Sequence, residues 1–274
     1  MRALMSRGLL AATLGLMTAA ATAAPLFANG FETDVAGWIT PTRVASGTGG
    51  ISSSSGSFHA TTAAGSGDFT RWGGYNYGAG AVPTAFQAYR TAVDIYLDAA
   101  GGWANNTRFD FSSAINNAAG GHLSDFIFNG GFYDDATGPG AGTNRFVISA
   151  SNNSQPGSAF AKNPARSPIA ISTTGWYTFQ HTFYDNAGVL AVDMEIFDAA
   201  DALVGNWTLS NPAHVIGTVG GNRYGWFDYS QFSTLAIDNS LLEITPAAVV
   251  PEPATLLLVG ASLLGLAASR RRRP

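Results

Sequence analysis

The sequence predicts an all-β protein whose body is an antiparallel sandwich of two sheets. Short runs in which apolar and polar residues alternate recur along the chain, as half-buried strands require. Residues that favour turns, mainly Gly, Asn, Asp and Ser, separate these runs. Outside the two ends of the chain, no window shows a sustained helical period. An α+β fold with undetected helices is the alternative.

The alternating runs give the expected strands in chain order. The first four lie at residues 90–97, 107–111, 125–128 and 145–148. A clearer series follows at 176–184, 189–197 and 203–209, and the last strands are expected at 223–229 and 234–244. The segments 185–188 and 198–202 have the lengths and residue types of hairpin connections. The clearer series therefore predicts a meander of three antiparallel strands.

The first 23 residues have the three zones of a secretory signal peptide. Arg2 and Arg7 supply positive charge, residues 8–17 are apolar, and residues 19–24 are small. The sequence Ala-Thr-Ala at 21–23 fits the cleavage pattern, so we expect the mature chain to begin at Ala24. A retained anchor is the alternative, although the apolar run is shorter than the roughly 20 residues that span a bilayer.

The last residues predict a short transmembrane helix with a cytoplasmic end. Residues 254–268 carry no charge and are followed by a cluster of arginines. Positively charged flanks stay in the cytoplasm, so the preceding domain must lie outside. Such a helix rises about 22 Å, against a hydrocarbon core of about 30 Å, and is a marginal permanent anchor. Two prolines just before it prevent the helix from continuing outward.

These C-terminal residues resemble the PEP-CTERM sorting signal. The resemblance is carried by the short apolar helix together with Pro251, Glu252, Pro253, Arg270, Arg271, Arg272 and Arg273. It implies recognition and cleavage by an exosortase, a membrane-embedded protease of bacteria that make exopolysaccharide. It further implies export through the inner membrane, transient anchoring there, and release to the cell surface or extracellular matrix. An ordinary tail anchor is the alternative, and the resemblance implies no activity.

The body between the targeting ends is acidic. We expect a signal peptide at 1–23, one β-sandwich domain at 24–246 and the sorting signal at 247–274. Between Ala24 and Val250, eight basic residues face seventeen acidic ones, a formal charge of −9. Such a body repels phosphate backbones, so nucleic acid is excluded as a partner, and neutral sugars, cationic polymers or divalent cations fit better. The absence of cysteine excludes a disulfide framework and a zinc-thiolate site.

Two parts of the body resemble known sandwich families. Residues 29–32 with Gly37 and Trp38, and residues 235–244, are similar to the first and last strands of jelly-roll carbohydrate-binding modules. Residues 175–177 with the strand at 189–197 are similar to concanavalin A-like and laminin-G-like sandwiches. The resemblances imply a jelly-roll β-sandwich and carbohydrate binding.

The jelly-roll resemblance also implies a structural calcium ion. In those modules an acid on the first strand and an acid on the last often bind calcium, and the matching residues are Glu32 and Asp238. Calcium takes six to eight oxygen ligands, so Asn239 or Asp68 and backbone carbonyl groups would complete the site. Two hydrogen-bonded or solvated acids without a metal are the alternative.

Asp193 and Glu195 are the best hint of catalysis. Two residues apart on a strand, they share a face about 6.6 Å apart, within the range of glycosidase carboxylate pairs. Laminarinase-like hydrolases, also concanavalin-type sandwiches, need a third acid where this strand has Phe197. Because the alternate residues of 192–196 point inward, the two acids are expected on a solvated outer face. We therefore predict no enzymatic activity, and a polysaccharide-active glycoside hydrolase or lyase is the alternative.

Aromatic side chains in glycine-rich segments are the remaining signal for ligand binding. The candidates are Trp72, Tyr75 and Trp103, which could stack on the apolar faces of sugar rings or fill the core. We assign Trp38, Trp176 and Trp207 to the core. The four histidines show no metal-ligand spacing.

These observations predict an exported, non-catalytic surface or extracellular-matrix protein that is sorted by an exosortase and associates with exopolysaccharide through its sandwich. The alternatives are a polysaccharide-active enzyme on the same fold and a structural or adhesive surface protein that binds no sugar.

Overall fold

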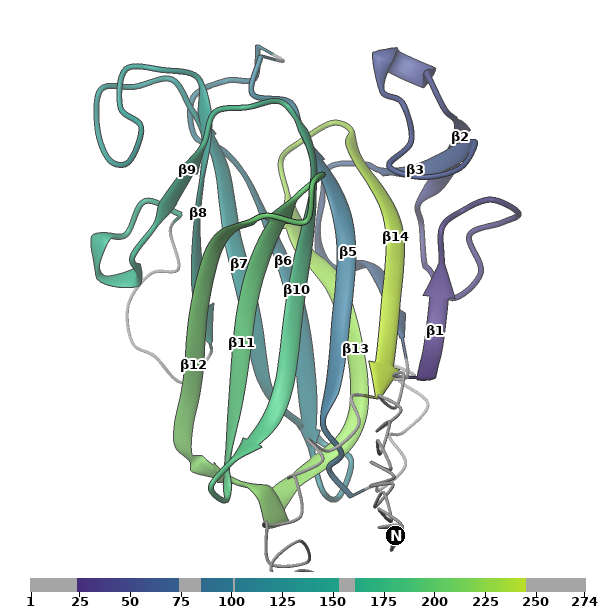
Figure 1. Ribbon diagram of the computed structural model, residues 1–274, viewed down its shortest axis with the longest axis vertical. Coiled ribbons are helices and arrows are strands. Elements are labelled where there is room, and N and C mark those ends of the chain that lie inside the picture. Colours follow the sequence, from purple (N-terminus) through teal and green to yellow (C-terminus); the bar gives the residue numbers. More distant parts are fainter. Residues whose placement is uncertain (1–23, 74–84, 101, 153–160, 245–274) are drawn as a thin grey trace, which may run out of the picture.

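The computed structural model describes residues 24–73, 85–100, 102–152 and 161–244. They form two antiparallel sheets packed face to face, which we call the front and back sheets as they lie in Figure 1. The front sheet has the order β12-β11-β10-β5-β14-β3-β2, with β1 also paired to β14. The back sheet has the order β4-β13-β6-β7-β8-β9.

The front sheet comprises β1 (Ala24–Asn29), β2 (Thr42–Ala45), β3 (Phe58–Thr62), β5 (Tyr89–Leu97), β10 (Gly175–Asn186), β11 (Val189–Asp198), β12 (Leu203–Val215) and β14 (Leu235–Ile244). The back sheet comprises β4 (Gly65–Gly73), β6 (Thr107–Asn117), β7 (His122–Tyr133), β8 (Arg145–Asn152), β9 (Ile169–Ile171) and β13 (Val219–Ser230). The helices in the described residues are short 3₁₀ turns, η1 (Thr48–Gly50), η2 (Pro164–Arg166) and η3 (Ile216–Thr218). Within this part of the chain, no helix has the length and apolar character needed to cross a bilayer.

Aromatic rings fill much of the space between the sheets. Phe109 on the back sheet lies 5.9 to 6.4 Å, centroid to centroid, from four other phenylalanine rings of the core. A Cβ atom at Gly130 on β7 would lie 2.6 Å from the Phe109 ring, so this ring fits only because its neighbour is glycine. Edge-to-face pairs of this kind each contribute about 0.5–1.5 kcal/mol beyond their buried area. The core therefore depends on ring geometry as well as on apolar area.

The structure confirms the all-β antiparallel sandwich. Each predicted strand lies within an observed one, except that β14 begins one residue later than expected. β10, β11 and β12 form the predicted meander. The first hairpin turn consists of Ala187 and Gly188, both with positive φ, as a two-residue turn between twisted strands requires. The sequence did not predict β2, β3, β4 and β9.

Two placements expected from the sequence are wrong. Glu32 does not lie on the first strand, because β1 ends at Asn29, whose side-chain oxygen accepts a hydrogen bond from the Phe31 amide at 2.7 Å and forms a turn. Trp176 does not lie in the core, because Tyr177 and the alternate residues after it take the inward positions of β10. Trp38 and Trp207 are buried as predicted.

The two ends of the described body meet. Ala24 of β1 pairs with Ile244 of β14, so the first and last strands start and finish at the same end of the sandwich (Figure 1). The expected signal peptide at 1–23 and the expected sorting signal at 247–274, with its helix, lie outside the described residues.

Candidate ligand groove on the front sheet

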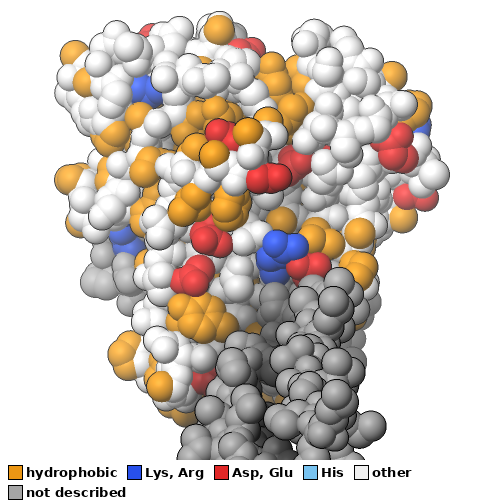
Figure 2. All heavy atoms as spheres, viewed as in Figure 1, with side chains coloured by type: hydrophobic (Ala, Val, Ile, Leu, Met, Phe, Trp, Pro, Cys, Tyr) orange, Lys and Arg blue, Asp and Glu red, His pale blue; other side chains and the backbone are white. Residues whose placement is uncertain are grey.

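A groove with a volume of about 370 Å³ lies on the outward face of the front sheet. The strand order β11-β10-β5-β14 brings together residues that are far apart in the sequence. The groove is lined by Arg90, Ala92, Asp94, Thr178, Gln180, Phe197, Asp201, Asn239 and Leu241. Figure 2 shows this face, where acidic side chains gather across the middle with hydrophobic side chains among them.

A chain of polar side chains crosses four strands at the groove. Glu243 on β14 forms an ion pair with Arg90 on β5 at 2.5 Å. The Arg90 guanidinium also donates to the Gln180 side-chain oxygen at 3.0 Å, and the Gln180 amide donates to Glu195 on β11 at 2.9 Å. These contacts hold the polar side chains in fixed positions before any ligand arrives, which lowers the entropy lost on binding.

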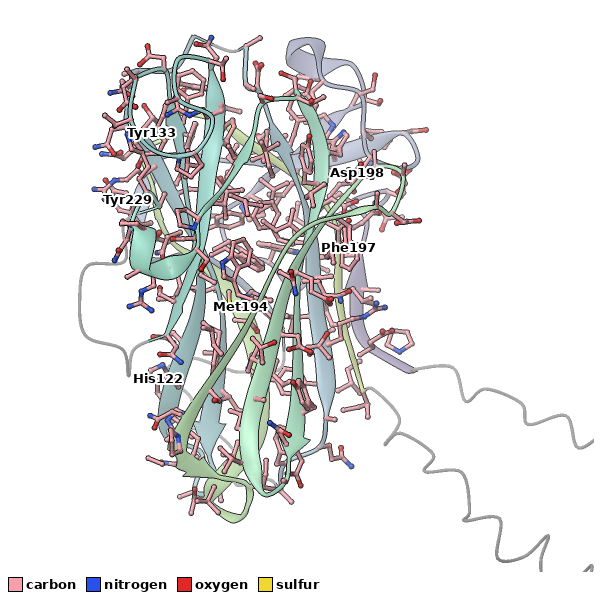
Figure 3. All side chains as sticks on the ribbon, turned by 60° about the vertical axis from the view of Figure 1, so that its left-hand side comes forward. His122, Tyr133, Met194, Phe197, Asp198 and Tyr229 are labelled. Atoms are coloured by element: carbon pink, nitrogen blue, oxygen red, sulfur yellow. The ribbon has the colours of Figure 1, made fainter. Side chains whose placement is uncertain are left out.

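Phe197 gives the groove an aromatic wall. It stands opposite Thr178 of β10 and is partly exposed, whereas Met194 on the same strand is fully buried in the core. Figure 3 shows Met194 between the sheets and Phe197 next to Asp198 at the upper end of β11. In the turn that follows, the exposed Asp201 has a φ of 59° and lies at the rim of the groove.

Asp94 forms part of the groove floor. It is only 8% exposed and stands directly opposite Asp238 of β14. Its carboxylate accepts hydrogen bonds from the hydroxyl groups of Ser54 and Thr178, both at 2.6 Å, and from the Asn239 amide at 2.8 Å. All three donors are neutral, so they solvate the charge of Asp94 without cancelling it.

Asp238 is fully buried beside Asp94. Its carboxylate accepts hydrogen bonds from the backbone amides of Ser55 at 3.2 Å and Asn239 at 2.8 Å. Among the described residues, neither acid forms an ion pair with a basic side chain. Burial, and after it the neighbouring Asp94 carboxylate, raises the pKa of Asp238 to about 6, against the effect of the amide donors.

Glu32 and Asp238, the two acids expected to bind calcium, hold the same loop from two sides. Glu32 accepts hydrogen bonds from the amides of Ser57 and Phe58 at 3.0 and 3.1 Å, while Asp238 holds the amide of Ser55. Within the described ranges, no group of three or more His, Cys, Asp or Glu side chains could hold a metal ion. The structure instead places Asp94 directly opposite Asp238, a pairing that the sequence analysis missed.

The predicted catalytic candidates lie on the outward face beside the groove. Asp193 accepts hydrogen bonds from Thr208 at 2.6 Å and from the Tyr184 hydroxyl at 3.3 Å. Glu195 accepts the amide of Gln180. Both carboxylates are partly exposed, and Phe197 occupies the next outward position of β11. As placed, the two acids hold neighbouring strands together.

Of the predicted ligand-binding aromatics, only Trp103 has a described side chain. It packs edge-on against Phe232 with ring centroids 5.0 Å apart, at the border of the core. Trp72 lies on β4 opposite Gly225, and Tyr75 lies outside the described residues. The aromatic residue of the groove is Phe197, which the sequence analysis considered only as a missing acid.

Comparison with known proteins identifies the C-terminal segment. Residues 249–273 match the PEP-CTERM protein-sorting motif, which indicates export, a C-terminal membrane-anchoring sorting signal and processing by an exosortase. No curated protein matches the chain.

Several solved structures resemble the body. The CBM2 module of the evolved Dit protein of Lactobacillus casei BL23 phage J-1 is 12% identical, with a TM-score of 0.41, over 81% of this chain and 96% of that chain. Lectin I-B4 of Griffonia simplicifolia in its metal-free form is 11% identical, with a TM-score of 0.36, over 80% and 99%. Alginate lyase from Alteromonas sp. 272 is 8% identical, with a TM-score of 0.29, over 65% and 79%. Because these TM-scores are low, we assign the fold from the strand pairing of the structure and not from these likenesses.

Proposed function

We propose that the protein is an exported, non-catalytic component of the cell surface or extracellular matrix that associates with polysaccharide through the groove of the front sheet. The observation that supports the proposal is the sorting motif at 249–273, which indicates export of the chain. Cleavage by an exosortase would then release the body from its transient anchor to its final location.

The groove has the chemistry of a sugar site. A sugar ring offers an apolar C–H face to an aromatic ring, and Phe197 supplies that ring. Sugar hydroxyl groups donate and accept hydrogen bonds, and the groove offers both kinds of partner through Asp94 and Asn239. The volume lies within the range of about 300–1,000 Å³ common for small-ligand sites.

A glycan array with the full chain in mild detergent tests this function. We expect binding to one class of glycan and about tenfold weaker binding by Phe197→Ala, since a stacking contact is worth on the order of 1 kcal/mol. The control is Leu203→Ala, which removes a side chain that is 52% exposed on the edge strand β12. If no glycan binds, or if Phe197→Ala binds as tightly as the unchanged chain, the protein is a structural or adhesive component rather than a sugar binder.

The absence of catalysis is tested separately. We expect the full chain to release no reducing ends or unsaturated products from a broad panel of polysaccharides. Release of product that is lost in Glu195→Gln but kept in Asp134→Asn, an exposed acid in a loop of the back sheet, would instead establish a polysaccharide-active enzyme.

We also propose a structural calcium ion at the acid pair of Asp94 and Asp238. Buried charges are usually paired or bound to a metal, and these two carboxylates have no basic partner within the described residues. Carboxylate and hydroxyl oxygens are among the ligands that calcium prefers, and Ser54 adds a hydroxyl group beside Asp94. The Asn239 side chain turns its amide nitrogen toward Asp94 and its oxygen toward Ser55. A bound cation would cancel the repulsion between the acids.

A further inference from the structure

We infer that the groove selects a cationic polysaccharide, one that carries free amino groups on its sugars. The inference rests on the proposed function and adds the charge class of the ligand. It begins from the composition of the outward face. Arg90 is the only Lys or Arg residue on β5, β10, β11, β12 and β14, whereas β11, β5 and β14 carry Glu195, Asp94 and Glu243 at or beside the groove.

The positive charge of Arg90 is already neutralised. Its guanidinium lies 2.5 Å from the Glu243 carboxylate on the neighbouring strand. Two further acids line the groove, Asp94 on the floor and Asp201 at the rim. The donors to Asp94 are two hydroxyl groups and an amide, so in calcium-free buffer they leave its negative charge uncancelled. The groove therefore carries net negative charge next to an aromatic wall.

This charge discriminates between three classes of polysaccharide. A polymer of uronic acids would bring carboxylates against Asp94 and Asp201 and would be repelled. A neutral polymer could stack on Phe197 but would gain nothing from the charge. A hexosamine polymer without its acetyl groups presents ammonium groups, which form charge-assisted hydrogen bonds with carboxylates while the ring stacks on the aromatic wall. The excess of nine negative charges between Ala24 and Val250 attracts the same polymer over longer distances.

Calorimetric titration of the full chain in detergent tests the inference. The probes are a glucosamine hexamer, its fully N-acetylated counterpart and a mannuronate hexamer, at a pH where the glucosamine amines are charged. We expect the glucosamine hexamer to bind at least tenfold more tightly than the acetylated one, and its affinity to fall as salt is added. The mannuronate hexamer should not bind.

Two variants locate the charge effect. Asp201→Asn keeps the size of the side chain and suits the positive φ of 59°, because asparagine adopts that conformation readily. It should weaken binding of the glucosamine hexamer several-fold more than it weakens binding of the acetylated hexamer. The matched control, Asp134→Asn, removes the same charge from an exposed loop of the back sheet and should change neither.

The outcomes separate this inference from the proposed function. Equal binding of the charged and acetylated hexamers, or tighter binding of mannuronate, overturns the inference while a groove that depends on Phe197 still supports sugar binding. An equal loss in Asp201→Asn and Asp134→Asn also overturns it, because the attraction would then be a property of the whole acidic body. If none of the three probes binds and the glycan array is also negative, the proposed function falls as well.

Discussion

At the scale of single residues, two buried ionisable groups give opposite pH dependences. Burial lowers the pKa of His181 to about 3, and its ring lies in the core with Nε2 3.0 Å from the Phe126 carbonyl oxygen. The folded state thus binds this proton less tightly than the unfolded chain. The resulting stability is complete above about pH 6.5 and is lost as the pH falls toward 3.

Asp238 acts in the other direction. Because its pKa is raised to about 6, the folded state binds the proton more tightly than the unfolded chain. Its contribution to stability is greatest below the ordinary aspartate pKa of about 4 and is lost as the pH rises toward 6. Between about pH 4 and pH 6, a rise in pH removes the stability that Asp238 contributes and restores the stability that His181 contributes, so the two effects partly cancel.

Asp238→Asn should therefore stabilise the protein at pH 8. The variant removes a buried charge opposite Asp94 and keeps an oxygen that can accept from Ser55. We expect the free energy of unfolding to rise by about 1 to 3 kcal/mol at pH 8 and to change little at pH 4. Chemical denaturation at both pH values measures this effect. An equal change at pH 4 and pH 8 would rule out the loss of a buried charge as its cause.

The same variant tests the calcium proposal. Millimolar calcium should raise the Tm of the unchanged chain at pH 8 and leave that of Asp238→Asn unaltered, because binding to the folded state alone stabilises it. Glu32→Gln should respond to calcium like the unchanged chain, since the proposed ion lies at Asp94 and Asp238. If calcium does not raise the Tm of the unchanged chain, no structural ion binds at the acid pair.

At the scale of elements, one buried arginine organises a long loop. Arg145 at the start of β8 has no exposed surface, and its guanidinium donates to backbone carbonyl groups around the loop between β7 and β8. The accepting residues are Tyr133, Asp135, Thr137, Pro139 and Thr143, with the Asp135 carboxylate as a further acceptor. A single side chain thus replaces the strand pairing that this loop lacks.

Arg145→Met should destabilise the protein strongly. It leaves several shielded carbonyl groups without donors, and removing one side of a buried charged network costs about 3 to 5 kcal/mol. Thermal unfolding and protease sensitivity of residues 134–144 measure the effect. Lys162→Met is the control, because Lys162 contacts the same Asp135 from a more exposed position, and we expect little change in Tm. Similar losses in both variants would contradict the central role of Arg145.

The sequence predicted the long strands because their alternation is regular. On β11 the residues from Val192 to Ile196 alternate strictly between apolar inward and polar outward positions, so their faces could be assigned from the sequence. The shorter strands β2 and β9 have only four and three residues, too few to show a period. Glu32 was misplaced because the turn that ends β1 depends on one side-chain hydrogen bond from Asn29.

The groove could not be predicted in the same way. Its lining comes from β5, β10, β11 and β14, and their neighbourhood depends on strand order, which alternation does not encode. Asp94 and Asp238 are 144 positions apart in the sequence yet stand opposite each other in the sheet. The pattern could have indicated that each faces outward, but not that they form a pair.

At the scale of the whole molecule, the ends of the body set its orientation. Ile244 pairs with Tyr89 at one end of β5, whereas Asp94 lies five residues further along this strand, about 16 Å away. A chain tethered through its C-terminal segment would hold the end with Ile244 near the membrane. The groove opens on the outward face of the sheet rather than at either of its ends, and its lining runs along β5 from Arg90 to Asp94.

Deleting residues 251–274 should change where the protein goes. The motif at 249–273 supplies both the exosortase site and the anchor, so we expect the truncated chain to lose processing and membrane association. Cell fractionation and the mass of the exported chain measure this outcome. Replacing Arg270, Arg271, Arg272 and Arg273 with glutamine tests orientation, because a reporter fused after Pro274 should then lose its cytoplasmic activity. Unchanged processing and location in the truncated chain would contradict the role of the motif.

The position of β14 has a consequence for the order of biogenesis. This strand is the last of the body, yet it lies inside the front sheet, where it pairs with β5 on one side and with β1 and β3 on the other. In a chain that emerges amino-terminus first, β1, β3 and β5 therefore lack the strand that joins them to one another until residue 244 has passed through the translocation channel. Since the sorting motif follows directly at 249–273, the sandwich of a tethered chain would close only after its anchor had reached the membrane, and a protease that cuts the motif would meet a finished domain.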